Sequence, residues 1–234
     1  ITANAPLGMT PLFVRAGTLI FGDTEIGVRF FGILSIAIDA LLVYGVTYTL
    51  TGFGGAEDAT VAAGVAGANG SVARVVKSAT AELWAGTTVS TGANQSIATI
   101  PFTATARSMT LRVRAPAAGI VVRLKVEDAA DPTRSVETEA TTTVANAWET
   151  LTFNFANQAT GTAALNLAFT YNKASVFFAF GTTGAAGGAG TYYFDELNFV
   201  AGGGGGGGGG GTGAGLPIDF DTAVRLTRAV GQTM

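Results

Sequence analysis

The chain has 234 residues, of which 48% are hydrophobic and only 12% are charged. Its 13 basic and 16 acidic residues give a net charge of −3, so it lacks the basic footprint of a nucleic-acid-binding protein. It contains no cysteine and no histidine, which excludes disulfides, thiolate or imidazole metal ligands, and Ser-His-Asp or Cys-His nucleophiles. A metal site made only of oxygen ligands stays open.

The N-terminal region divides into two parts. Residues 1–25 are a mixed segment with two prolines, and residues 26–46 are the most hydrophobic stretch of the chain. A membrane-spanning helix needs about 20 apolar residues, but Arg29 and Asp39 interrupt this stretch. Its Ile, Val, Phe and Gly content favours buried strands, so we predict no membrane span.

Alternating polar and apolar residues run through residues 46–200, the pattern of strands that bury one face. The alternation is clearest at 109–115 and 120–128. Turn sequences rich in Gly, Ala, Asn and Asp separate these strands from five more, at 135–144, 148–155, 164–171, 175–181 and 191–200. Seven or more strands without helical periodicity predict an all-β fold, a β-sandwich of the jelly-roll type spanning residues 26–200.

Ten consecutive glycines, Gly202–Gly211, precede a short tail. Residues 216–221 read LPIDFD and residues 34–39 read LSIAID, so both fit Leu-x-Ile-x-(aromatic or aliphatic)-Asp. We interpret residues 201–215 as a flexible linker spanning about 15–20 Å, and residues 216–234 as the first strand of a next repeat. The alternative is that two unrelated edge strands both end in Asp.

Trp84 is the strongest candidate for a ligand-binding residue, because small residues flank it in AELWAGTTV. A sugar ring stacks its C–H face on an indole, while nearby carboxylates or amides bind its hydroxyl groups. Glu82 is the carboxylate nearest in sequence, and Tyr171 and Asn172 are weaker candidates in a predicted loop. The alternative is that such rings only fill the sandwich, which is our prediction for Trp148.

Glu137 and Glu139 share one strand face, about 6.5–7 Å apart along the strand. Paired carboxylates can hydrolyse glycosides. On a Thr-rich strand without an aromatic cleft residue beside them, however, such pairs usually serve solubility. No Lys-Ser/Thr follows the glycines, so they are no phosphate loop. We therefore predict that the chain is not an enzyme.

Three stretches carry a family resemblance: residues 121–129, the sequence TTTVANAWETLTF at 141–153, and YYFDELNF at 192–199. With them, residues 46–200 resemble the jelly-roll carbohydrate-binding-type modules of secreted, multimodular bacterial proteins. The resemblance implies a non-catalytic, extracellular or cell-surface module that holds a partner enzyme near a polysaccharide.

The resemblance also implies a structural calcium ion, held by Asp195 in the final strand and Asp39 in the first. The strand around Asp39 is more hydrophobic than the family pattern. Separately, APLGMTPLFVRAGTLI at residues 5–20 is similar to the stretch after the catalytic barrel in glycoside hydrolase family 31. That similarity implies a remnant of an upstream enzyme module, and the alternative is a chance similarity.

A second hypothesis is structural. The chain would be a repeating subunit of an extracellular fibre or surface layer, in which residues 26–46 complete a neighbour's sheet by strand complementation. Low charge and Thr-rich strands suit such self-association. The oligomeric state separates the two hypotheses, since a binding module is monomeric and a fibre subunit polymerises.

Overall fold

The computed structural model describes residues 48–201, Ile218 and Phe220, all within one compact unit that spans residues 46–221. The predictions for residues 1–25 and 26–46, including Asp39, lie outside the described residues, as do those for most of the linker and tail. Within the described part of the chain, no helix is long and apolar enough to cross a membrane.

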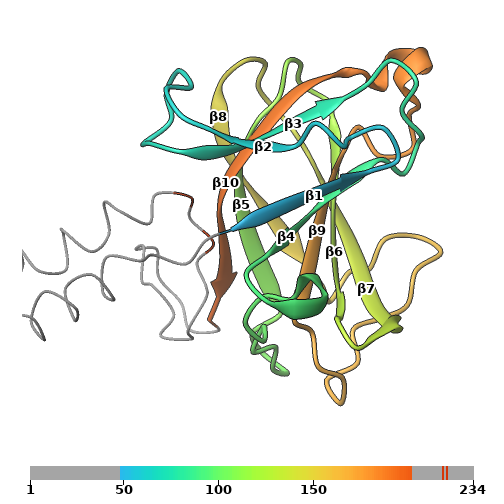
Figure 1. Ribbon diagram of the computed structural model, residues 1–234. Helices are drawn as coiled ribbons and strands as arrows, with labels where there is room; N and C mark the ends of the chain where they lie inside the picture. Colours follow the sequence, from blue (N-terminus) through green and yellow to red (C-terminus); the bar gives the residue numbers. More distant parts are fainter. Residues whose placement is uncertain (1–47, 202–217, 219, 221–234) are drawn as a thin grey trace, which may run out of the picture. The chain divides into compact units, whose positions relative to one another are not determined.

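The described residues form two antiparallel five-stranded sheets packed face to face (Figure 1). The first sheet has the order β1 (Thr49–Phe53), β4 (Gly86–Ser90), β9 (Lys173–Phe178), β6 (Val121–Asp128) and β7 (Asp131–Thr141). The second has the order β2 (Thr60–Ala62), β3 (Val72–Lys77), β10 (Gly190–Val200), β5 (Ser108–Arg114) and β8 (Trp148–Asn154). A 3-10 turn (η1, Ala93–Gln95) and a π-helical turn (η2, Gly184–Gly188) lie between strands. The predicted all-β jelly-roll sandwich is confirmed.

The alternation in the sequence sets which faces meet. Leu111 in β5 and Leu124 in β6 are fully buried, whereas the residues next to them are partly exposed. Burial of such a side chain stabilises the fold by about 1.5–3 kcal/mol. Across the core, Phe178 of the first sheet stacks on Tyr192 of the second with ring centroids 4.8 Å apart. The two inner faces therefore form one core.

The prediction of a strand over residues 164–171 is wrong. Asn166 Oδ1 accepts a hydrogen bond from the backbone N–H of Ala168 (3.0 Å), and its carbonyl accepts one from the N–H of Phe169 (3.1 Å). These local bonds give the backbone an alternative to a sheet ladder. The apolar residues that suggested a strand include Leu167 and Phe169, which are exposed in this loop.

Strand β10 is irregular between Asp195 and Asn198, where its register against β5 shifts. At this irregularity Leu197 exchanges both backbone hydrogen bonds with Ile218, at 3.0 and 2.9 Å. Ile218 is fully buried and Phe220 nearly so. Part of the segment after the glycines therefore belongs to the core of this sandwich. Whether residues 216–234 open a next repeat stays a prediction.

Candidate functional site

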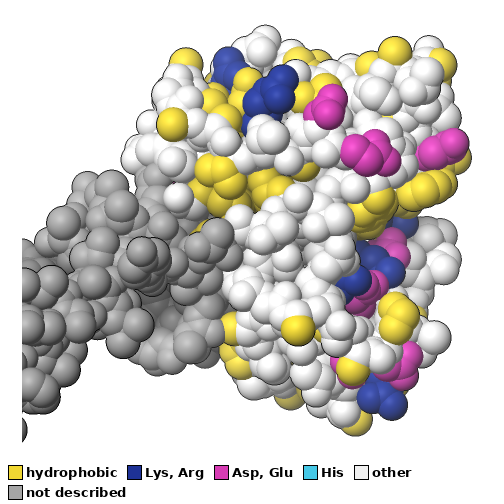
Figure 2. Space-filling view, in the orientation of Figure 1, with side chains coloured by type: hydrophobic (Ala, Val, Ile, Leu, Met, Phe, Trp, Pro, Cys, Tyr) yellow, Lys and Arg dark blue, Asp and Glu magenta, His cyan; other side chains and the backbone are white. Residues whose placement is uncertain are grey.

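An open cleft of about 490 Å³ lies on the outer face of the first sheet. In β6 the core residues alternate with Arg123, Lys125 and Glu127, so these three side chains point outward and line the cleft. The same alternation places Phe177 of β9 and Glu137 of β7 there. On the face seen in Figure 2, basic and acidic side chains lie together over β6 and β7, next to hydrophobic ones.

Aromatic rings line one part of the cleft without interruption. Trp84, which is 48% exposed, stacks on Phe53 with centroids 6.2 Å apart and an interplanar angle of 20°. Phe53 contacts the edge of Phe177 at 5.7 Å, and Phe177 contacts Phe180 at the same distance. The cleft therefore offers an accessible indole face backed by three further rings.

Gly54 allows the indole to lie where it does. Its φ is +68°, in the left-handed region that favours glycine, and an added Cβ would lie 2.8 Å from Cζ3 of Trp84. The carbonyl of Gly54 also accepts a hydrogen bond from the N–H of Glu82 (2.8 Å), which ties the Trp84 turn to the end of β1. Gly54 was not predicted as a functional residue; the signal in the sequence is the pair of glycines directly after β1.

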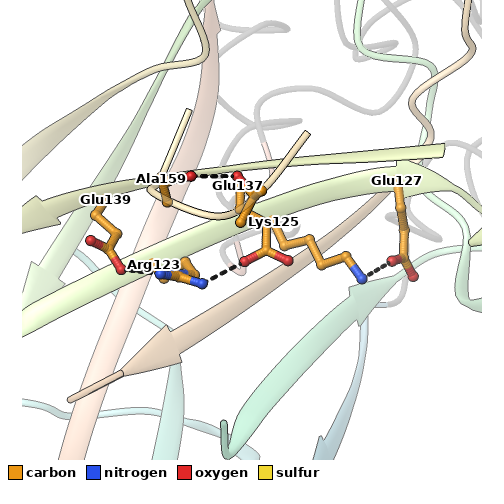
Figure 3. Close-up of polar contacts among 7 residues, drawn as sticks. Arg123, Lys125, Glu127, Glu137, Glu139 and Ala159 are labelled. Carbon is orange, nitrogen blue, oxygen red and sulfur yellow. Dashed lines mark hydrogen bonds and ion pairs between the residues drawn. The ribbon is translucent and has the colours of Figure 1, made fainter. Parts of the chain in front are cut away.

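The guanidinium of Arg123 joins the aromatic rings to the polar part of the cleft. It lies 3.5 Å from the ring centroid of Phe180. Its Nη1 donates to Glu137 Oε2 (2.8 Å) and its Nε to Glu139 Oε1 (2.8 Å), as Figure 3 shows. Two carboxylates and an aromatic ring thus fix the plane of this guanidinium.

Two lysines hold the buried carboxylate of Glu127. Lys125 Nζ lies 2.6 Å from Glu127 Oε2 and Lys173 Nζ lies 2.9 Å from Oε1; Figure 3 includes the first of these pairs. Burial raises the pKa of Glu127, but hydrogen bonds and charge from both lysines outweigh burial, so the pKa lies below its ordinary value of 4.5. The carboxylate is therefore ionised at neutral pH.

Trp84 lines the cleft, but Glu82, predicted as its carboxylate partner, does not. Glu82 is exposed in the turn between β3 and β4. The carboxylates that line the cleft are instead Glu127 and Glu137, which come from strands distant in sequence. The expectation that no aromatic residue accompanies Glu137 is wrong, because Phe180 and Glu137 line the same cleft.

Tyr171 is not at the surface as expected. It is only 2% exposed, its ring meets that of Phe102, and its hydroxyl oxygen accepts a hydrogen bond from the N–H of Asn166 (3.1 Å). The Oδ1 of Asn172 accepts a hydrogen bond from the N–H of Ala129 (2.8 Å). These two residues hold loops together, and neither lines the cleft.

Trp148 lies on β8 in the other sheet. The guanidinium of Arg112 lies 4.6 Å from its ring centroid, and its Nε1–H donates to the carbonyl of Ala66 (3.0 Å). Trp148 is partly exposed, so it packs on the outer face of the second sheet and does not anchor the core as predicted.

Asp195, one of the two predicted calcium ligands, is buried on β10. Among residues 48–201, 218 and 220, no three acidic side chains gather into a group that could hold a metal ion. The carboxylate of Asp195 cannot by itself supply the six to eight oxygen ligands that calcium takes. The other predicted ligand, Asp39, lies outside the described residues. Calcium binding stays a prediction.

No family model and no curated protein matches the sequence. Solved structures similar to the chain include the family 11 carbohydrate-binding module of a cellulosomal cellulase of Clostridium thermocellum, at 13% identity and a TM-score of 0.41 over 66% of this chain and 88% of that one. A family 30 carbohydrate-binding module matches at 8% identity and a TM-score of 0.42, over 66% and 84%. A family 29 module from Piromyces equi matches at 10% and 0.35, over 64% and 77%. These values are too low to assign a ligand to this chain.

Proposed function

We propose that the sandwich is a non-catalytic carbohydrate-binding module, and that the cleft on its first sheet binds a polysaccharide. One observation carries the proposal. The exposed indole of Trp84 begins a series of ring contacts that runs through Phe53, Phe177 and Phe180. Phe180 in turn contacts Arg123, so one open cleft holds both a stacking surface and a row of hydrogen-bonding groups. Sugars present apolar C–H faces and polar edges, and they need both kinds of surface.

The polar groups of the cleft are held in place before a ligand arrives. Arg123 is fixed by two carboxylates, and Lys125 and Lys173 are fixed by Glu127. Side chains already immobilised by their neighbours lose little conformational entropy on binding. This row can therefore hydrogen-bond sugar hydroxyl groups at low cost.

The charges of these polar side chains cancel, which favours an uncharged polysaccharide. The three basic side chains are matched by three acidic ones within hydrogen-bonding distance: Arg123, Lys125 and Lys173 with Glu127, Glu137 and Glu139. A uronate or sulfate group would meet carboxylates as well as cations, with no net attraction. We therefore propose a neutral glycan as ligand and binding that depends little on salt.

A module of this kind acts where polysaccharide is found, outside the cell or at its surface. A single cleft of this size gives modest affinity, which suffices when the module is one of several in a larger protein and tethering raises the effective concentration. Its role would be to hold a partner enzyme near the polymer.

Affinity electrophoresis of the full chain tests this function. Native gels containing one neutral or one anionic polysaccharide each are compared with a gel without polymer. We expect retardation by at least one neutral polysaccharide, at low and high salt alike. Retardation only by anionic polymers, lost at high salt, would contradict the proposal, as would release of reducing sugar ends from the bound polymer.

A further inference from the structure

Most polar side chains that line the cleft already have a partner within the protein. The five charged ones form the ion pairs described above. The hydroxyl groups of Thr88 and Ser175 share a hydrogen bond of 2.8 Å, and the hydroxyl of Thr162 donates to the carbonyl of Ala159 (2.8 Å). Among the residues that the structure describes, Gln95 is the one polar cleft residue whose side chain makes no such bond. Its amide is therefore available to a ligand.

The amide of Gln95 suits a sugar hydroxyl. The side chain is partly exposed, so a ligand in the cleft can reach it. Its oxygen accepts hydrogen bonds and its nitrogen donates two. A hydroxyl group also donates and accepts, so it can satisfy either end of the amide, and neither partner carries a charge. Gln95 thus matches a neutral glycan, as the balanced charges of the cleft do.

The backbone holds Gln95 in an unfavourable conformation. In η1 both Asn94 (φ +55°) and Gln95 (φ +57°) lie in the left-handed region. Asparagine is enriched there and glycine adopts it without strain, whereas glutamine has no such preference. The carbonyl of Ser96 closes the turn by accepting hydrogen bonds from the N–H groups of Thr91 (2.8 Å) and Gly92 (3.1 Å). Strained residues cluster at ligand-binding sites, so this conformation points to a role in binding.

Gln95 and Trp84 lie near opposite ends of β4. Trp84 comes just before this strand and Gln95 in the turn just after it, and Thr88 in the middle of the strand also lines the cleft. The five residues of β4 extend about 15 Å at the rise of a strand. A single sugar stacked on Trp84 is too short to reach Gln95, whereas an extended chain lying along β4 contacts both.

We propose that Gln95 binds hydroxyl groups of a neutral sugar chain that runs along β4 from the indole of Trp84. The cleft then recognises a stretch of several sugars, with a stacking contact near one end and an amide contact near the other. This role of Gln95 depends on the function proposed above, to which it adds a second binding residue and the direction of the ligand.

A glycine at position 95 separates binding from folding. Gln95→Gly removes the amide and relieves the left-handed strain, which offsets the extra freedom that glycine gives the unfolded chain. We expect an unfolding midpoint no lower than that of the unaltered chain. We also expect about threefold to tenfold weaker binding of long oligosaccharides from the retarding neutral polysaccharide, the effect of one neutral hydrogen bond. The ratio of the two affinities should grow with oligosaccharide length.

Two further variants serve as controls. Asn94→Gly relieves the neighbouring left-handed residue, which is exposed and does not line the cleft, so we expect unchanged affinity. Gln95→Ala removes the amide but keeps the strain, and we expect the same loss of affinity as in Gln95→Gly.

Four results overturn this role of Gln95. They are an unchanged affinity in Gln95→Gly, an equal loss in Asn94→Gly, a lower unfolding midpoint in Gln95→Gly, and an affinity ratio that does not change with oligosaccharide length. If Trp84→Ala still weakens binding in those cases, the function proposed above stands without Gln95. If no neutral polysaccharide retards the unaltered chain, both the proposed function and the role of Gln95 are wrong.

Discussion

The indole of Trp84 lies nearly parallel to the ring of Phe53, 6.2 Å away, and is still 48% exposed. Phe53 sits at the end of β1 and Trp84 in the turn between β3 and β4, so the contact joins the end of a strand of the first sheet to the turn that connects the two sheets. A sugar-stacking residue needs one ring face held by a neighbouring side chain and the other face open to solvent.

Replacement of Trp84 by alanine removes this stacking surface. We expect Trp84→Ala to weaken polysaccharide binding at least tenfold, which corresponds to about 1.4 kcal/mol, while the free energy of unfolding changes by about 1 kcal/mol or less because half of the side chain is exposed. Leu83→Ala is the matched control, since Leu83 is 44% exposed but does not line the cleft. Equal loss of affinity in the two variants would show that binding lies elsewhere.

Gly54→Ala tests whether the position of the indole matters. An alanine Cβ would press against the indole and would also hold φ at +68°, a conformation that costs about 1 kcal/mol for a residue other than glycine. We expect a modest fall in the unfolding midpoint and a loss of glycan affinity approaching that of Trp84→Ala. Gly119→Ala, at φ +80° with no atom near the added Cβ, is the control for backbone strain. Unchanged affinity in Gly54→Ala would mean that the indole need not lie at this place.

Acid should weaken the fold through Glu127. Its pKa is lower in the folded chain than the ordinary value of 4.5, so below that value the unfolded chain binds more protons than the folded chain does. The stabilisation by Glu127 is therefore complete above about pH 4.5 and is lost as the pH falls through the lowered pKa. We expect Glu127→Gln to be less stable than the unaltered chain at neutral pH and to lose less stability on acidification. Thermal unfolding midpoints measured from neutral to acid pH check this, and parallel curves for the two proteins would contradict it.

Substitution of Lys77 should destabilise the fold more than substitution of most other residues. Its buried Nζ donates to the carbonyls of Phe178 (3.2 Å), Ala179 (2.9 Å) and Thr182 (2.8 Å). Lys77→Met keeps most of the side chain but removes all three hydrogen bonds of the ammonium, although the carbonyl of Ala179 keeps the one from the N–H of Thr182 (3.1 Å). We therefore expect a loss of about 3 kcal/mol in the free energy of unfolding.

The control for Lys77→Met is Arg107→Met, because the side chain of Arg107 donates one hydrogen bond of 3.4 Å, from its Nε to the exposed carbonyl of Thr103. We expect that variant to lose about 0.5 kcal/mol or less. Denaturant unfolding measures both changes. A loss in Lys77→Met as small as in Arg107→Met would show that the ammonium does not hold these carbonyls.

The sequence predicts the sandwich because strand alternation is a local property. Arg123 and Lys125 alternate with buried aliphatic residues in β6, and the outward face of this strand follows from the pattern alone. The cleft could not be predicted in the same way. Lys173 reaches Glu127 only because β9 pairs with β6 across a separation of more than forty residues.

The exposure of Trp84 could be predicted, because the small residues next to it in the sequence leave its ring accessible. Tyr171 was misplaced for the opposite reason. The polar residues after it suggested a surface loop. In the structure its ring contacts that of Phe102, which is distant in the sequence, and its hydroxyl oxygen accepts a hydrogen bond from the N–H of Asn166. Local sequence cannot show such enclosure, because it is a property of the packed structure.

The most direct test of the central claim uses the two tryptophans of the chain, one beside the first sheet and one on the second. The full chain, Trp148→Phe and Trp84→Phe are each titrated with oligosaccharides of the retarding neutral polysaccharide while tryptophan fluorescence is recorded. We expect a saturable change in the full chain that persists in Trp148→Phe and disappears in Trp84→Phe. A change that persists in Trp84→Phe and disappears in Trp148→Phe would place the binding site on the second sheet and contradict a binding cleft on the first.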